Sequence, residues 1–223
     1  MLEATVFDLD ETLVDSAATW NHVIGAVAAC HGHPWSPGDW AAIQGTSTAH
    51  WSAYLAHRCP DLTPESAVTA CVDGMVAALG HGRFGLLPGA AGLVATAAGR
   101  GPVALVSASP GRYVRAAAAA CGLVFPTIVT GDDVARGKPA PDPYLLAAHR
   151  LGIAPERCLA VEDSGSGIRS AHAAGMTVLA IPNTTTARDF AVLELAVHRA
   201  ADARVAAGLL PSLVGAALGA GAR

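Results

Sequence analysis

The sequence predicts an α/β protein with a doubly wound parallel sheet and an inserted domain made only of helices. Short apolar strands alternate with amphipathic helices in the second half of the chain, which is typical of a parallel sheet covered on both faces. The first and second strands are separated by roughly three times the length of an ordinary crossover, which takes about 30 residues. Because no strand pattern lies between them, this stretch is predicted to be the insertion.

Five predicted strands are short, apolar and followed by turn or polar residues. They are residues 4–8, 103–106, 127–130, 158–161 and 177–181. The helical spacing of apolar residues predicts the helices of the sheet domain at 90–98, 112–121, 143–151 and 166–174. The remainder, 187–223, is predicted to be helical with one short strand near 200–203, and the tail after Leu218 is predicted to fray.

The insertion has the pattern of a small helical bundle. Its predicted helices are 16–31, a segment from Ser36 or Asp39 to Gln44, 50–57, and one from Thr63 to Leu79 with Pro64 at the first helical position. The domains are therefore predicted as 1–14 with 86–223 for the sheet core and 15–85 for a helical cap. The cap leaves the carboxyl end of the first strand, where ligands bind in open α/β sheets, so it is well placed to act as a lid.

Composition narrows the partners of the protein. The chain is 52% hydrophobic and 14% charged, with a net charge of −4, so it lacks the basic field that attracts nucleic acid or acidic membranes. Its five cysteines have no CxxC spacing and predict neither disulfides nor zinc. There is no pattern of a signal peptide or a membrane span. We expect a cytoplasmic monomer or weak homodimer that binds a small molecule.

Two carboxylates stand at the carboxyl end of the first predicted strand. Asp8 and Asp10 are two residues apart, and side chains at that spacing point the same way in a strand. Like charges held this close repel unless a cation or a shared proton offsets the repulsion. Ligands that offer only oxygen suit a hard cation such as Mg²⁺.

Other charged and polar residues follow the later strands. Ser107 ends the second strand, and Glu162 and Asp163 end the fourth. Lys138 lies in the proline-rich loop from Gly137 to Pro143, between the third and fourth strands. The carboxyl ends of parallel strands share one edge of the sheet, so this edge would gather four carboxylates, a hydroxyl and an ammonium. A metal ion together with a phosphate needs both kinds of charge.

The order of these motifs resembles a known family. The matching segments are Val6-Phe7-Asp8-Leu9-Asp10-Glu11-Thr12-Leu13, Val106-Ser107, Gly137-Lys138-Pro139 and Val161-Glu162-Asp163-Ser164. In this order the chain resembles a haloacid dehalogenase (HAD) superfamily hydrolase with an α-helical (C1) cap. That subfamily holds phosphoglycolate phosphatase, sugar-phosphate phosphatases and β-phosphoglucomutase. The resemblance implies a Rossmann-like core and a Mg²⁺-dependent phosphatase that acts on a small phosphomonoester.

The resemblance also implies roles for the motif residues. Asp8 would be the nucleophile that forms an aspartyl-phosphate, and Asp10 the general acid and base. Mg²⁺ would bind carboxylate oxygens of Asp8 and Asp163 and the backbone carbonyl of Asp10, with Glu162 in support. Phosphate would be held by Ser107, Lys138 and the backbone N–H groups of Leu9 and Ala108. Ser109 and Ser164 are expected to cap helix starts.

The cap is expected to set substrate specificity. Candidate residues are Trp20, Gly45, Thr46, Ser47, His50 and Trp51. Glu11 stands where the family commonly has glycine, so it must tolerate the turn geometry, and its charge would disfavour very acidic substrates. β-Phosphoglucomutase has a histidine at the position that Trp20 occupies here, and His22 lies on a different helical face.

Other activities stay open at this point. A phosphomutase of the β-phosphoglucomutase type is the alternative, weakened by Trp20. A haloacid dehalogenase usually lacks the carboxylate set, and phosphonate hydrolysis uses a cap lysine that residues 15–85 do not contain. A binding module without catalysis would be expected to lack the nucleophile, and Asp8 is present.

Overall fold

A computed structural model describes residues 1–215, and its centre is a six-stranded sheet in which every neighbouring pair is parallel. The strands are β1 (Ala4–Phe7), β2 (Val103–Val106), β3 (Thr127–Val129), β4 (Cys158–Glu162), β5 (Thr177–Ala180) and β6 (His198–Arg199). Their order is β3-β2-β1-β4-β5-β6, so β1 lies centrally between β2 and β4. The predicted α/β class with a doubly wound parallel sheet is confirmed.

Helices occupy both faces of the sheet and form the insertion. The insertion contains α1 (Ala17–Cys30), α2 (Pro37–Ile43), α3 (Thr48–Arg58) and α4 (Pro64–Gly80). The sheet domain contains α5 (Ala90–Ala98), α6 (Gly111–Ala120), α7 (Asp142–Leu151), α8 (Gly165–Ala173), α9 (Phe190–Leu193) and α10 (Ala203–Leu213). Short 3-10 turns stand at Gly131–Asp133, Pro155–Arg157 and Thr186–Arg188. None of the described helices is both long and apolar enough to cross a membrane.

The two faces of the sheet are packed differently. Larger side chains of the strands, including Phe7, Leu105 and Leu159, belong to the core that continues through α5, α6 and α10. The opposite face presents mostly alanine and valine toward α7 and α8. Successive strand residues alternate between faces, so the chain places large and small side chains by the period of two. Small residues leave room for Tyr144 of α7, which is fully buried against the sheet.

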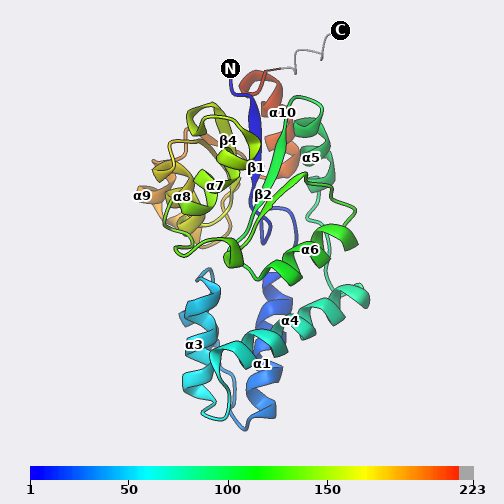
Figure 1. The fold of residues 1–223 in the computed structure, drawn as a ribbon, viewed down its shortest axis with the longest axis vertical. Helices are drawn as coiled ribbons and strands as arrows, with labels where there is room; N and C mark the ends of the chain where they lie inside the picture. The colour runs from blue at the N-terminus through cyan, green and yellow to red at the C-terminus, as the bar shows by residue number, and fades with distance from the viewer. Residues whose placement is uncertain (216–223) are drawn as a thin grey trace.

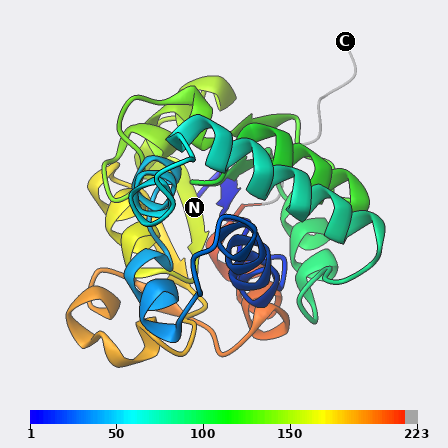
Figure 2. The same ribbon diagram turned by 90° about the horizontal axis from the view of Figure 1, so that it is seen from below.

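The helical insertion lies beyond one end of the sheet. In Figure 1, α1, α3 and α4 lie below the sheet domain, and the N-terminus lies at its opposite end, beside α10. The view from below in Figure 2 has these helices in front of the sheet. Helix α4 packs against α1, α3 and also α6 of the sheet domain. The cap therefore contacts the core through a helix as well as through its connections.

Two connections join the cap to the core, and they pair with each other. The N–H of Asp15 donates to the carbonyl of Gly85 at 3.0 Å, and the N–H of Leu87 donates to the carbonyl of Leu13 at 2.9 Å. All four cap helices lie between these connections. We propose that the connections mark the boundary between a core of 1–14 with 86–223 and a cap of 15–85.

The C-terminal region departs from the prediction. The short strand lies at His198–Arg199 rather than near 200–203, because Asp202 accepts the N–H of Val205 at 2.8 Å and starts α10 at Ala203. Residues 187–202 are mostly turns and not a continuous helix, so that prediction was wrong. The expected fraying after Leu218 lies outside the described residues.

A buried carboxylate organises the inside of the cap. Asp39, which is 2% exposed, accepts hydrogen bonds from the backbone and hydroxyl of Ser36 and from the Tyr54 hydroxyl at 2.8 Å. Arg58 lies 3.0 Å from it. Hydrogen bonds from Ser36, then from Tyr54, and the charge of Arg58 hold the pKa of Asp39 well below its usual range.

Replacing this carboxylate should destabilise the protein. We expect Asp39→Asn to lower the free energy of unfolding by about 2 kcal/mol, because a buried, charge-assisted network loses its acceptor. The lowered pKa means that the contribution of Asp39 is fully present above the unfolded pKa of about 3.9 and is lost at lower pH. Urea unfolding should therefore give a constant difference between wild type and variant from neutral pH to about pH 5, and a shrinking difference below about pH 4.

A matched control is Asp73→Asn. Asp73 pairs with Arg112 at the surface, and both side chains are more than half exposed. An exposed pair contributes little, so this variant should change the free energy of unfolding by less than about 0.5 kcal/mol. Equal losses in the two variants would contradict a special role for Asp39.

Candidate active site

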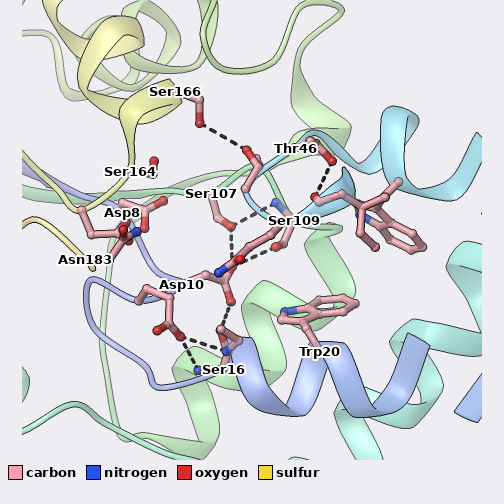
Figure 3. A pocket seen from close by; sticks show the side chains of 18 of the residues that line it. Asp8, Asp10, Ser16, Trp20, Thr46, Ser107, Ser109, Ser164, Ser166 and Asn183 are labelled. Carbon is pink, nitrogen blue, oxygen red and sulfur yellow. Dashed lines mark hydrogen bonds between the residues drawn. The ribbon is translucent and has the colours of Figure 1, made fainter. Parts of the chain in front are cut away.

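The carboxyl ends of β1, β2 and β4 meet beneath the cap at one pocket. Its floor includes Asp8, Asp10, Ser107, Lys138 and Asp163. The cap contributes Trp20, Ile24, Trp40, Ile43 and Trp51, with Gly45 and Thr46 from the loop before α3. Thr48 donates to the carbonyl of Ala108 at 3.0 Å, and Ser166 donates to that of Gly45 at 3.4 Å, so cap and core are joined across the pocket. Figure 3 shows the pocket from close by.

Lys138 is the buried cation of this floor. Its Nζ atom lies 2.6 Å from Asp8 Oδ1 and 2.6 Å from Glu162 Oε1, and it donates to the carbonyl of Val106 at 3.2 Å. Burial alone would lower the pKa of Lys138, but the two carboxylates outweigh it and raise that pKa. The ammonium therefore stays charged beside Asp8.

Glu162 holds Lys138 in place and is itself fully occupied. One oxygen accepts from Lys138 and from the Tyr144 hydroxyl at 2.6 Å. The other accepts from the Ser164 hydroxyl at 3.1 Å and from the N–H groups of Asp163 and Ser164. Glu162 is 0% exposed. Its carboxylate thus acts as a fixed anchor for the lysine.

Asp8 and Asp163 form the open part of an acidic cluster. One carboxylate oxygen each of Asp8, Glu162 and Asp163 lies within 4.8 Å of the others. Asp163 is oriented by the Thr12 hydroxyl at 3.2 Å and by the Asn183 amide at 2.7 Å. Burial raises the pKa of Asp8 to about 7 although Lys138 acts against it, and burial with the charges of Asp8 and Glu162 raises that of Asp163.

This donor set fits a hard divalent cation. When all three carboxylates are ionised, they outweigh the one ammonium by two negative charges in a buried volume, and the ligands are all oxygens. A cation such as Mg²⁺ or Ca²⁺ has these preferences, whereas zinc favours nitrogen and sulfur. The cluster can therefore hold a divalent metal.

The carboxylate of Asp10 is turned toward hydroxyl groups. One oxygen accepts from Ser16 and Tyr113, both at 2.7 Å, and the other accepts from Ser109 at 2.8 Å and Ser107 at 3.3 Å. Figure 3 shows three of these hydroxyls converging on it. Because Ser16 precedes cap helix α1, the same carboxylate contacts both cap and core. Ser109 was expected to cap a helix and instead donates to Asp10, whereas Ser164 does cap α8 through the N–H of Gly167.

Glu11 adopts a left-handed backbone conformation with φ of 62°. Such a conformation costs roughly 1–2 kcal/mol for a residue other than glycine. Its side chain recovers part of this cost, because one oxygen accepts the N–H groups of Ser16 and Ala17, both at 2.9 Å. Ser16 makes no side-chain cap of its own, so Glu11 caps α1. The turn thus tolerates glutamate in the way that was expected.

Four of the six predicted cap residues line the pocket, and two do not. Trp20, Gly45, Thr46 and Trp51 line the pocket. Ser47 and His50 are not among its lining residues. The Ser47 hydroxyl accepts the N–H of His50 at the start of α3, and His50 is exposed. Leu9 is a fully buried core residue, and Ala108 lines the pocket.

Several residues of the site were not predicted from the sequence. They are Tyr113, Tyr144, Ile24, Ile43, Gln44 and Asn183. Asn183 follows the end of β5, so the strand-end argument used for Ser107 could have found it. The tyrosines reach the site from the sides of α6 and α7, and an apolar helical pattern gives no signal for such a contact.

Fold and site together define the class of the protein. A parallel sheet with an acidic cluster, a buried lysine and a ring of hydroxyls at its carboxyl edge, beneath a helical insertion, is the arrangement of an α/β hydrolytic enzyme. A family model for haloacid dehalogenase-like hydrolases matches residues 2–175. The chain belongs to this family.

Similar proteins cover most of the chain. It is 33% identical over 201 residues to the protein CbbY of Rhodobacter capsulatus, across 84% of this chain and 88% of that one. It is 36% identical over 186 residues to hexitol phosphatase A of Escherichia coli, across 79% and 81%. A crystal structure of a CbbY mutant from Rhodobacter sphaeroides, in complex with xylulose-(1,5)bisphosphate, is 29% identical with a TM-score of 0.82 and covers 92% and 96%.

Gly167 provides a test of the Glu162 anchor. A Cβ atom at this position would overlap the Glu162 carboxyl group. We therefore expect Gly167→Ala to displace Glu162 from Lys138 and to lower the free energy of unfolding by about 2–3 kcal/mol. Denaturant unfolding measures the change.

The control is Gly92→Ala in α5, where nothing lies within 4 Å of the added atom. This variant should be neutral or up to about 1 kcal/mol more stable, because alanine favours the helix. If Gly167→Ala were as stable as this control, the rigid placement of Glu162 would be wrong.

Proposed function

We propose that the protein is a Mg²⁺-dependent phosphatase that hydrolyses a small phosphomonoester through an aspartyl-phosphate on Asp8. The observation that carries this proposal is the contact of the Asp8 carboxylate with buried Lys138 at 2.6 Å, beside Asp163 on the pocket floor. A nucleophilic carboxylate needs a phosphoryl group brought close to it. The ammonium offsets the repulsion between two anions.

Asp8 and Asp10 would divide the chemistry between them. An oxygen of Asp8 attacks phosphorus, the bond from phosphorus to the leaving alcohol breaks, and Asp10 gives that alcohol its proton. Asp10 then takes a proton from a water molecule that attacks the acyl phosphate, which releases phosphate and restores Asp8. The four hydroxyls around Asp10 hold its side chain at the pocket until the substrate arrives.

Phosphate oxygens would be held by Lys138, the Ser107 hydroxyl and the N–H groups of Leu9 and Ala108. Lys138 and Ser107 both line the pocket within the same floor as Asp8. Hydrogen-bond donors fixed in a buried site stabilise the charge that moves in the transition state. Glu162 would act through Lys138, because its own oxygens are already occupied.

Carboxylates of Asp8 and Asp163, with the backbone carbonyl of Asp10, would hold Mg²⁺. The bound ion would supply charge neutralisation for the phosphate and its transition state. The fit of the oxygen donors to a hard cation supports this choice. Glu162 would support the site by holding Lys138 beside these ligands.

The relatives support a phosphomonoester substrate. The name of hexitol phosphatase A describes a phosphatase of sugar alcohols. A CbbY mutant was crystallised with the sugar bisphosphate xylulose-(1,5)bisphosphate. Sugar phosphates and phosphoglycolate are the substrates that the family resemblance implies. A cytoplasmic location and a monomer or weak homodimer stay predictions.

The alternative activities have less support. A mutase of the β-phosphoglucomutase type has a histidine where this chain has Trp20. The Trp20 ring packs against the rings of Trp51 and Tyr113, and an indole cannot act as the acid or base that the histidine provides. No histidine is found among the pocket-lining residues in the described part of the chain, and His22 is exposed outside the pocket. The acidic cluster also argues against a haloacid dehalogenase.

Asp8→Asn should abolish the reaction. An amide cannot form the acyl phosphate, so phosphate release from a panel of phosphomonoesters should fall by roughly three orders of magnitude or more. The variant preserves side-chain shape. Full turnover in this variant would refute the nucleophile assignment.

Chelation provides an independent test of the metal. EDTA should stop phosphate release, and added Mg²⁺ should restore it. Asp163→Asn removes one carboxylate ligand, so the Mg²⁺ concentration for half-maximal activity should rise by about 10-fold or more. Unchanged turnover in EDTA would remove the metal from the proposal.

A further inference from the structure

We propose that the pocket selects monophosphate esters of uncharged alcohols that carry a broad apolar face, and that it disfavours bisphosphates and carboxylate-bearing phosphates such as phosphoglycolate. This inference rests on the proposed phosphatase function and defines the substrate class of the same site. The charges of the pocket and the composition of its cap wall lead to it independently.

The pocket has almost no unpaired positive charge that could bind a second anionic group of a substrate. Lys138 is the single lysine or arginine among its described lining residues, and Asp8 and Glu162 already hold it. Four carboxylates line the same space, those of Asp8, Asp10, Glu11 and Asp163. One bound divalent cation would be used by the transferring phosphoryl group. A second anionic group on the substrate would meet uncompensated negative charge.

Arg58 and Arg112 are held in ion pairs outside the pocket. Arg58 of α3 lies 3.0 Å from buried Asp39, inside the cap. Arg112 of α6 pairs with Asp73 at the surface. Neither arginine lines the pocket. Recruiting Arg58 would leave Asp39 buried without its cation, which is costly.

The cap wall of the pocket is apolar. Trp20, Ile24, Ile43 and Trp51 are each at most 8% exposed, and Trp40 completes the wall from α2. A leaving group that buries an apolar face here gains free energy in proportion to the area removed from water. A small, hydrophilic alcohol such as glycolate has no broad apolar face to bury against this wall.

Trp20 keeps this wall rigid. Its ring packs edge-on against the Tyr113 ring, with 4.9 Å between the ring centroids, and its centroid lies 5.9 Å from that of the Trp51 ring. The Tyr113 hydroxyl is held by Asp10. Trp20 is therefore fixed between cap and core, and in Figure 3 its ring stands beside the hydroxyl cluster around Asp10.

Polar groups of the cap offer hydrogen bonds without charge. The Thr46 hydroxyl is already used, because it donates to the carbonyl of Ile43 at 2.7 Å. Gln44 is exposed at the edge of the pocket, with its amide available to a substrate hydroxyl. The cap thus suits a neutral alcohol.

Two substrates that differ by one remote charge test the inference. Benzyl phosphate presents a neutral apolar face, and 4-carboxybenzyl phosphate adds a carboxylate far from the reacting bond. We expect kcat/KM to be about tenfold lower or more for the carboxylated ester, because its charge enters an acidic pocket. Glycerol 3-phosphate, which has a neutral but hydrophilic leaving group, should also fall below benzyl phosphate.

A charge at the edge of the pocket should reverse the preference. Gln44→Arg should raise kcat/KM for 4-carboxybenzyl phosphate relative to benzyl phosphate by several-fold. Ala42→Arg is the matched control, because Ala42 is exposed on helix α2, two residues before Gln44, but does not line the pocket. The control should leave the ratio of the two substrates close to that of the wild type.

The outcomes separate the two proposals. If none of these esters released phosphate, the proposed phosphatase function would itself be wrong. If glycerol 3-phosphate, 2-phosphoglycolate or the carboxylated ester were cleaved as efficiently as benzyl phosphate, the enzyme would remain a phosphatase and the selectivity inference would be overturned. An equal response of the ratio to both arginine variants would also overturn it.

Discussion

The buried ion pair network around Lys138 is the constraint on which the rest of the site depends. One ammonium is shared between Asp8 and Glu162, each 2.6 Å away, in a volume that holds a third carboxylate. Removing water from four charged groups is expensive, so every remaining lone pair needs a partner. Tyr144, Ser164 and backbone N–H groups provide these partners for Glu162. Tyr144 lies in α7 and Ser164 begins α8, so the helices on this face of the sheet help to hold the network.

The packing of the sheet serves the same network. Alanine and valine on the α7 and α8 face let the helices approach closely, which brings Tyr144 over the strands and Gly167 against Glu162. The opposite face uses large side chains and continues into the cap through Trp20 and Tyr113. One face of the sheet thus fixes the charges of the floor, and the other connects the floor to the cap.

Sequence reasoning found the residues that follow strands and missed those that reach the site from helix sides. Asp8, Ser107 and Asp163 could be predicted to converge because parallel strands end at one edge. Tyr113 and Tyr144 could not, since their place depends on how a helix is rotated against the sheet. The strand was predicted near 200–203 but lies at His198–Arg199, because Asp202 caps the start of α10. The apolar pattern of the sequence gives no signal for such a cap.

The paired connections at residues 13–15 and 85–87 have a consequence for the cost of binding. A cap joined to the core by two adjacent chain segments cannot diffuse away from the pocket, so its effective concentration there stays high. Once a substrate is bound at the pocket floor, its contact with the cap is intramolecular, so little further translational or rotational freedom would be lost when the cap touches it. The tryptophans of the cap can therefore contribute to affinity in a way that the same residues on a separate protein could not.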